Sequence, residues 1–307
     1  MKTAVRSETA PPRSGGGARA ALAAYYHLTK PRIVVLLLIT TVPSMVLADK
    51  GLPSPWLIAA TLLGGTMSAG GANAINQFLD RDIDEIMTRT RRRPLPAHVI
   101  KPGYALAYGI ALGVAGFVWM LATVSLLAAL LSAGALAFYV FVYTSWLKRS
   151  SPQNIVIGGA AGAAPALVGW AAVTGGVGWP AVVLFAIVFL WTPPHFWALS
   201  LRYQRDYRAA GVPMLPVVVG LEGTTRSIVR YSFLLVAVTL VLWPVAHTGL
   251  IYPVLAALLG VLFILRALRL RSAGTIAVAM SLFRYSIVYL ALLFGAVALD
   301  TLVKYGL

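Results

Sequence analysis

Long apolar runs dominate this chain and limit what it can fold into. Nine of them reach the length at which a helix crosses a bilayer, around 17 to 25 residues. They lie near residues 33–49, 55–79, 105–123, 125–145, 154–173, 178–200, 229–247, 249–266 and 285–303. The chain is 59% hydrophobic and only 11% charged, which is typical of membrane proteins. We therefore predict an all-α, polytopic membrane protein with nine transmembrane helices.

The distribution of lysine and arginine predicts how these helices are oriented. If the N-terminus is cytoplasmic, 23 of the 25 lysines and arginines fall on the cytoplasmic side, and only Lys50 and Lys304 fall outside. This asymmetry follows the positive-inside rule and places the C-terminus outside. The net charge of +16 does not indicate a nucleic-acid partner, because the basic residues are scattered between apolar segments.

The N-terminal segment differs from the rest of the chain. Residues 1–24 are rich in Gly, Ser, Ala and Arg and lack the apolar core of a signal peptide, which predicts a disordered cytoplasmic tail. Residues 25–307 then form a single transmembrane domain. The chain has no cysteine, which excludes disulfides, thiolate metal sites and a cysteine nucleophile.

A polar stripe ends the second apolar run. If the helix continues through it, Asn73, Asn76, Asp80 and Asp84 fall on one face, and Asp82 falls on the opposite face. Amide and carboxylate oxygens are suitable ligands for Mg²⁺, which substrate phosphates often complete. The stripe therefore predicts a magnesium site, and the alternative is a solvated acidic turn at the membrane surface.

A second polar stripe follows the sixth run. The Pro193-Pro194 pair predicts a break or kink, and beyond it His195, Arg202 and Asp206 share a face. This face predicts substrate contacts opposite the first stripe. A helix ion pair and a structural, hydrogen-bonded histidine are the alternatives.

Four cations are expected to converge on the same face of the membrane, each from a different helix end. Together they predict a pocket for a phosphate ester; they are Lys30, Arg93, Lys148 and Arg202. Glycine pairs inside the helices predict close helix packing or room for a bulky ligand. Such a charged layer above apolar helices suits a lipid diphosphate. Aromatic side chains near the layer would shield a carbocation formed when its allylic C–O bond ionises; they include Tyr143, Trp191, Phe196 and Trp197.

These motifs resemble a known superfamily. The Asn76-x3-Asp80-x3-Asp84 stripe, the Arg91/Arg93-Pro94-Leu95-Pro96 sequence and nine helices resemble the intramembrane, UbiA-type prenyltransferases. Several further segments resemble the protoheme IX farnesyltransferase branch of that superfamily: 29–33, 70–76, 143–149, 152–162, 191–197, 206–207 and 211–216. The resemblance is dense from about residue 25 to residue 220.

The resemblance implies transfer of farnesyl from farnesyl diphosphate to a vinyl group of heme b, giving heme O. It implies Mg²⁺ at Asn76, Asp80, Asp84 and Asp206, and diphosphate contacts at Lys30, Arg93, Lys148 and Arg202. Asp80, Asp84, Asp206 and Lys148 would be the catalytic residues. Asn73, Tyr143 and His195 would contact substrate. It also implies a plasma-membrane protein with its active site at the cytoplasmic side, and heme A synthase as a partner.

The second acidic motif departs from the superfamily pattern. It generally has at least two aspartates, whereas this chain offers Asp206 alone, with arginines at 202 and 205. Either a second metal is held more weakly or the arginines take over part of the diphosphate charge. Two other functions stay open: prenyl transfer to an aromatic acid or quinone precursor, and a polytopic transporter.

Overall fold

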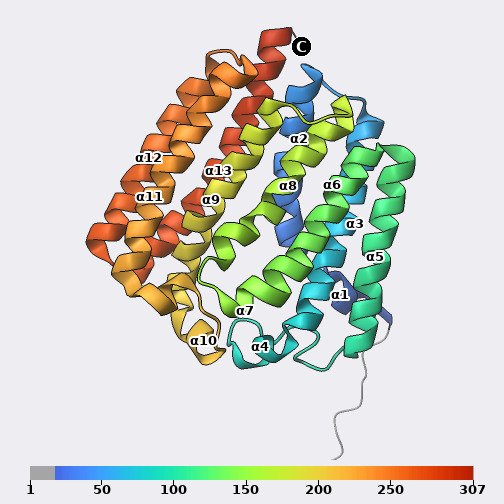
Figure 1. The fold of residues 1–307 in the computed structure, drawn as a ribbon, viewed down its shortest axis with the longest axis vertical. Coiled ribbons are helices and arrows are strands. Elements are labelled where there is room, and N and C mark those ends of the chain that lie inside the picture. The colour runs from blue at the N-terminus through green and yellow to red at the C-terminus, as the bar shows by residue number, and fades with distance from the viewer. Residues whose placement is uncertain (1–17, 307) are drawn as a thin grey trace, which may run out of the picture.

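The structure is a computed structural model that describes residues 18–306, and this part of the chain is all-α (Figure 1). Its long helices run side by side from one end of the bundle to the other. In chain order the longer elements are α1 (Ala18–Leu28), α2 (Pro31–Asp49), α3 (Pro55–Leu79), α5 (Pro102–Thr123), α6 (Leu126–Ala137), α8 (Asn154–Thr174), α9 (Trp179–Arg202), α11 (Leu215–Ala246), α12 (Ile251–Ala273) and α13 (Ile276–Tyr305). A π-helix, η1 (Phe138–Leu147), continues α6, and the short helices are α4 (Arg81–Ile86), α7 (Lys148–Ser150) and α10 (Gln204–Ala209).

Each of the nine predicted apolar runs coincides with a helix. Within residues 18–306, seven helical segments are long and apolar enough to cross a membrane. The other two runs correspond to α2, whose apolar stretch Leu37–Asp49 is shorter, and to α3. Glycines and the polar residues Asn73, Asn76 and Gln77 dilute the apolar character of α3. The structure therefore shows a multi-pass helical membrane protein, and the count of nine spans stays a prediction.

Small residues set the closest helix contacts. A methyl group on Gly71 of α3 would lie 2.6 Å from the backbone oxygen of Gly109 on α5 and 2.8 Å from the backbone nitrogen of Gly113. On α8, a methyl group on Gly169 would lie 2.6 Å from the backbone oxygen of Thr41 on α2. Glycine at these positions lets the backbones touch, as in other membrane helix pairs. The packing interpretation of the glycine pairs is confirmed for Gly71, and Gly169 has the same role although it belongs to no pair.

Helix ends follow local sequence signals. The side chains of Ser54, Ser125 and Thr275 accept hydrogen bonds from backbone N–H groups in the first turns of α3, α6 and α13. Gly175 and Gly274 end α8 and α12 with φ angles of 68° and 62°, a conformation that glycine adopts without strain. These caps produce the short turns that join antiparallel helices.

The helix break expected at Pro193-Pro194 and the disorder expected for residues 18–24 do not occur. α9 runs without interruption from Trp179 to Arg202, so the Pro193-Pro194 pair does not break it. Residues 18–24, expected to belong to a disordered tail, form the start of α1, and Ala24 is buried. The rest of the predicted tail, residues 1–17, lies outside the described residues. The short helices α4, α7 and α10 gather with α1 at the end of the bundle opposite the C-terminus (Figure 1).

Candidate active site

The acidic stripe lies at the end of the bundle that carries the short helices. The expected continuous helix ends at Leu79, and Asp80 joins α3 to α4 with φ −90° and ψ 5°. The helical i to i+4 hydrogen-bond pattern continues through this junction. The backbone N–H of Asp80 donates to Asn76 O at 2.9 Å, and the backbone N–H of Asp84 donates to Asp80 O at 2.8 Å. Asp80 and Asp84 are therefore both buried, with 0% and 1% of their surface exposed. Asp82 points away from the stripe, as expected, and it pairs with Arg149 at 2.8 Å.

Three cations contact this buried stripe. The Lys148 Nζ lies 2.5 Å from Asp80 Oδ2, and the Arg93 Nη1 lies 2.7 Å from Asp84 Oδ2. The Lys30 Nζ donates to Asn76 Oδ1 at 2.6 Å. Lys30 lies at the α1–α2 junction, Arg93 in the segment after α4, and Lys148 at the first position of α7. The structure thus brings together three of the four predicted cations around two carboxylates.

Lys30 is held in an unusual state. Its backbone is left-handed, with φ 51°, a conformation that costs energy in a residue other than glycine. Burial lowers the pKa of its ammonium well below the ordinary 10.5; Arg93 and Lys148 add to the lowering, whereas Asp80 and Asp84 oppose it. A further negative charge bound near Lys30 would therefore stabilise its protonated, ammonium form.

Asn76 and η1 organise the middle of the cluster. The Asn76 Nδ2 donates to Asp80 Oδ2 at 2.7 Å and to Thr144 Oγ1 at 3.0 Å. In η1, the Thr144 hydroxyl donates to the Tyr139 carbonyl five residues earlier, a contact that accompanies the wide π-helical turn. π-helical turns are frequent at functional sites. Here η1 places Thr144 against Asn76 and leads directly into Lys148.

One atom of the stripe has no partner. Asp80 Oδ1 is fully buried and accepts no hydrogen bond from any residue in the described part of the chain. An orphaned, buried carboxylate oxygen is costly unless a cation or donor binds it. The donor set of Asp80, Asp84 and the Asn76 amide is oxygen-rich, as Mg²⁺ prefers. These residues therefore fit a magnesium ion.

Asp206 lies in a neighbouring cluster with different partners. The Thr88 hydroxyl donates to its Oδ2 at 2.7 Å, and the Arg89 backbone N–H donates to the same oxygen at 3.4 Å. Within residues 18–306 no three acidic or histidine side chains are close enough to share a metal. The structure thus does not bring Asp206 into one metal site with Asp80 and Asp84.

Tyr207 stands between the two clusters. Burial raises the pKa of its phenol above the ordinary 10; Asp206 and Asp84 raise it further, and Arg89 and Arg93 lower it. The Arg89 guanidinium donates to the Tyr207 hydroxyl at 3.4 Å and lies 5.3 Å from the ring centroid of Tyr203. The sequence prediction missed Thr88, Arg89 and Tyr207, although Arg89 belongs to the basic run behind the stripe.

The remaining predicted residues are not all at this cluster. Arg202 ends α9, is exposed, and lies 5.8 Å from the ring centroid of Tyr203. Arg89 contacts Asp206 through its backbone N–H, and its guanidinium lies at the Tyr207 hydroxyl. The expected face shared by His195, Arg202 and Asp206 is broken where α9 ends. Asn73 donates to the Thr29 carbonyl at 3.0 Å, one residue before Lys30, and so supports the position of that lysine.

His195 is fixed by neighbours on α9 and α13. Its ring stacks on Trp191 at 4.1 Å and on Phe283 at 4.7 Å, and its Nδ1 lies 2.7 Å from Ser286 Oγ. The Ser286 hydroxyl donates to the Phe283 carbonyl, so it accepts from His195. The proton is thereby assigned to Nδ1, which leaves the Nε2 lone pair available as an acceptor.

An apolar cavity of about 150 Å³ opens beside the charged cluster. Asn73 and Tyr139 line one end, and Thr41, Thr61 and Val168 line the other. Along α3, Thr61 and Asn73 are twelve residues apart, which corresponds to about 18 Å of helix. Gly65 and Gly162 also line this cavity, so some glycines leave room for a ligand, the second of the two interpretations. Next to it Tyr139 and Tyr143 stack at 5.3 Å.

Comparison with known protein families shows to which family this chain belongs. A model of the UbiA prenyltransferase family matches residues 37–293. The chain belongs to this family. It is therefore an enzyme of a prenyltransferase family, as the motifs indicated.

Curated relatives agree with this family and are similar over most of their length. A protoheme IX farnesyltransferase of Parafrankia sp. is 59% identical over 263 residues, 85% of this chain and 84% of the relative. One of Gloeobacter violaceus is 55% identical over 265 residues, 86% of this chain and 87% of the relative. These values confirm the predicted resemblance.

Solved structures show the same fold at much lower identity. A structure of digeranylgeranylglyceryl phosphate synthase superposes with a TM-score of 0.76 at 19% identity and covers 91% of this chain and 98% of that chain. A UbiA homolog from Archaeoglobus fulgidus, bound to GPP and Mg²⁺, gives 0.60 at 18% identity, covering 90% and 99%.

Proposed function

We propose that this enzyme transfers a farnesyl group from farnesyl diphosphate to a vinyl group of heme b, with Mg²⁺, and yields heme O. One observation carries the proposal: a charged layer, in which partly buried cations contact buried carboxylates, borders an apolar cavity. Its members are Asp80, Asp84, Lys30, Arg93 and Lys148. A diphosphate fits the layer and a hydrocarbon chain fits the cavity. The relatives' name, protoheme IX farnesyltransferase, suggests that the prenyl group is farnesyl and that the acceptor is heme b.

The dimensions support a prenyl chain in the cavity. A farnesyl group has twelve carbons along its main chain, which reach roughly 15 Å when extended with C–C bonds near 1.5 Å. The cavity lining follows α3 for about 18 Å between Asn73 and Thr61. The diphosphate then lies beside Asn76 and Asp80, and the tail points into the bundle.

Charge balance explains how the layer accepts a diphosphate. Without ligand, three cations face two carboxylates, an excess of one positive charge. A diphosphate ester near charge −3, together with one Mg²⁺, adds one negative charge and neutralises the layer. Asp80 and Asp84 would hold the metal, with Asp80 Oδ1 as the open position. Lys30, Lys148 and Arg93 would then turn their donors toward the diphosphate oxygens.

The residues of the chain promote ionisation of the allylic C–O bond. Bound Mg²⁺ supplies charge neutralisation of the departing diphosphate. Lys30, Arg93 and Lys148 stabilise the same charge from positions fixed before the bond breaks. The bond breaks with its electron pair on the diphosphate, and the stacked rings of Tyr139 and Tyr143 face the allylic cation and keep water away.

The acceptor then completes the reaction. The vinyl group of heme b supplies the electron pair for the new C–C bond, and the positive charge moves to the carbon next to the pyrrole. Water adds there and loses a proton, which gives the hydroxyethylfarnesyl side chain. His195, with its Nε2 lone pair free, is proposed to contact the heme.

The cellular setting is part of the same proposal. The enzyme would lie in the plasma membrane with nine spans, its N-terminus cytoplasmic and its C-terminus outside. The charged layer would then face the cytoplasm, and heme A synthase would consume the product. The lysine and arginine distribution supports this orientation.

The experiment compares acceptors directly. Membranes containing the protein are incubated with farnesyl diphosphate, Mg²⁺ and either heme b or 4-hydroxybenzoate, and products are identified by liquid chromatography and mass spectrometry. We expect farnesylated product from heme b alone and none after chelation of divalent ions. Product from the aromatic acid alone would refute the heme acceptor, and no product from either would favour transport.

A further inference from the structure

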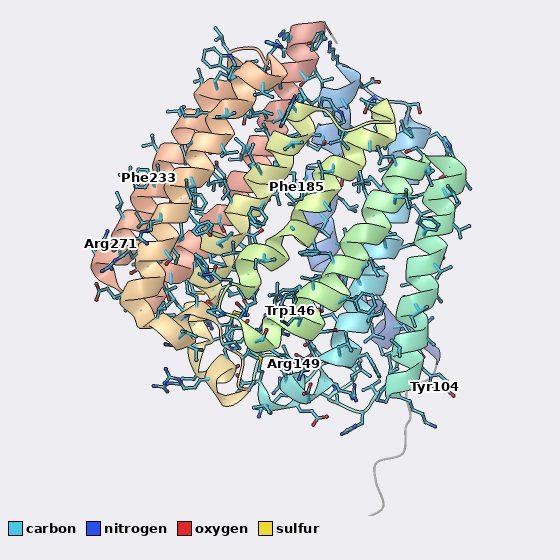
Figure 2. All side chains as sticks on the ribbon, in the orientation of Figure 1. Tyr104, Trp146, Arg149, Phe185, Phe233 and Arg271 are labelled. Atoms are coloured by element: carbon cyan, nitrogen blue, oxygen red, sulfur yellow. The ribbon has the colours of Figure 1, made fainter. Side chains whose placement is uncertain are left out.

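A separate group of arginines lies on α12 and α13, which the proposed reaction does not use. Arg266, Arg269 and Arg271 lie near the end of α12, and Arg284 lies on α13. Figure 2 labels Arg271 at the edge of the bundle, on the flank opposite α3 and α5 in Figure 1. Arg271 therefore lies on the far side of the bundle from α3, the helix that carries Asn76 and leads into Asp80.

These arginines lack a counter-charge. The sequence has no Asp or Glu between Glu222 and Asp300. Asp300 lies at the other end of α13, where its carboxylate accepts hydrogen bonds from the backbone N–H groups of Gly249 and Tyr252. None of the four arginines forms an ion pair with another residue within 18–306. Their positive charge is therefore available to an anion from outside this part of the chain.

Two of the arginines line a groove of about 420 Å³ between the helices. Apart from these arginines and Ser281, its lining is apolar: Leu262 and Leu265 on α12, and Ala277, Val278 and Leu282 on α13. Leu262 and Leu265 are 47% and 56% exposed, and Leu258, one turn earlier on the same face, is 58% exposed. The groove thus combines cations with an apolar wall that continues along α12.

Arg266 is held ready for a ligand. Its Nη1 donates to Ser281 Oγ at 3.0 Å, and its guanidinium lies 4.6 Å from the ring centroid of Tyr285. The Tyr285 hydroxyl is itself fixed, because it donates to the Leu259 carbonyl at 2.8 Å. A guanidinium has five N–H donors. Ser281 is the one side-chain acceptor found for Arg266 among the described residues, so most donors are free for an anion.

We propose that this groove binds one anionic phospholipid. Its phosphate would lie on Arg266 and Arg269, and its acyl chains along Leu262 and Leu265. Guanidinium groups bind phosphate through paired hydrogen bonds, and basic pockets between membrane helices select anionic headgroups. A zwitterionic lipid fits less well, because its cationic group would approach the same arginines. A solvated cationic surface is the outcome against which the proposal is tested.

The test measures lipid retention by the purified, full-length protein. Native mass spectrometry counts phosphatidylglycerol bound after titration, with phosphatidylcholine and inorganic phosphate as parallel titrations. We expect one phosphatidylglycerol to bind most tightly. For Arg266→Gln with Arg269→Gln we expect roughly 30-fold weaker binding, since each basic side chain contributes roughly fivefold near an anionic headgroup. Inorganic phosphate should neither bind comparably nor compete, because it lacks the chains.

Two further variants separate the groove from general charge. Arg284→Gln removes one arginine outside the groove and should leave binding within about twofold. Ala277→Trp keeps every charge but fills the groove from an exposed position, and it should weaken phosphatidylglycerol binding at least tenfold. Unchanged binding in both the double variant and Ala277→Trp would overturn the proposal. An equal loss in Arg284→Gln would also overturn it, as would equal binding of phosphatidylcholine.

Discussion

Replacing Asp80 by Asn separates the metal-binding role of the stripe from a purely structural one. Asp80 is fully buried, is paired with Lys148 at 2.5 Å and keeps one oxygen without a partner. The amide has the same shape and retains acceptor capacity, so packing changes little. The layer then has three cations and one carboxylate, instead of three cations and two carboxylates. We expect farnesyl transfer to fall by about 10² to 10³, the loss typical of removing one preorganised electrostatic group.

Asp82→Asn is the matched control, with the same substitution two residues away. Its carboxylate is 61% exposed and pairs with the partly exposed Arg149, an arrangement that contributes little to stability. Figure 2 labels Arg149 at the end of the bundle that carries α4 and α7. We expect Asp82→Asn to keep farnesyl transfer within about twofold of wild type, because exposed pairs of this kind are weak.

Diphosphate binding distinguishes loss of the metal from loss of the fold. In the presence of a chelator, Asp80→Asn has one more uncompensated cation, so inorganic diphosphate should bind it as tightly as wild type or more tightly. Thermal unfolding of the detergent-solubilised protein reports both stability and this ligand effect. Wild-type turnover in Asp80→Asn would refute the reasoning. So would an equal loss of turnover in Asp82→Asn.

Three further predictions test other parts of the structure. Because burial lowers the pKa of Lys30 well below 10.5, its ammonium loses its proton as the pH rises through that lowered value. KM for farnesyl diphosphate should therefore already rise with pH below 10.5, and Lys30→Arg should flatten the profile. Gly65 lies about 12 Å along α3 from Asn73, so Gly65→Phe should impair farnesyl relative to geranyl diphosphate by at least roughly tenfold in kcat/KM. Gly71→Ala should destabilise the α3–α5 contact by about 1–3 kcal/mol in thermal unfolding, whereas Gly65→Ala, with nothing within 4 Å, should not.

The sequence predicted the helices better than the contacts between their ends. Apolar length is a local property, so runs such as 55–79 and 154–173 match α3 and α8 almost residue for residue. The break at Asp80 and the uninterrupted α9 were missed, because spacing alone does not say whether a helix continues. In α9 the two prolines are accommodated within a tightly packed helix, in which both are buried.

The cluster was predicted in part for a similar reason. Shared faces and helix ends correctly grouped Asp80, Asp84, Lys30, Arg93 and Lys148. Choosing Arg89 instead of Arg202 as the neighbour of Asp206 requires the path of the chain after α4, which no periodicity reveals. Thr144 reaches Asn76 across the π-helical segment η1, a local geometry that the apolar pattern does not show.

The single aspartate of the second acidic motif now has a physical explanation. Within residues 18–306 Asp206 belongs to no group of three acidic or histidine side chains that could share a metal, and its Oδ2 accepts hydrogen bonds from Thr88 and the Arg89 backbone. The side chain of Arg89 lies beside Tyr207, and the charges of Asp206 and Asp84 both raise the pKa of the Tyr207 phenol. For the proposed diphosphate, these contacts favour the Arg89 guanidinium, and not a second strongly held metal, as the positive charge on this side. Arg89→Met should then weaken inorganic diphosphate binding even in the presence of a chelator, and unchanged binding would return the choice to a second metal.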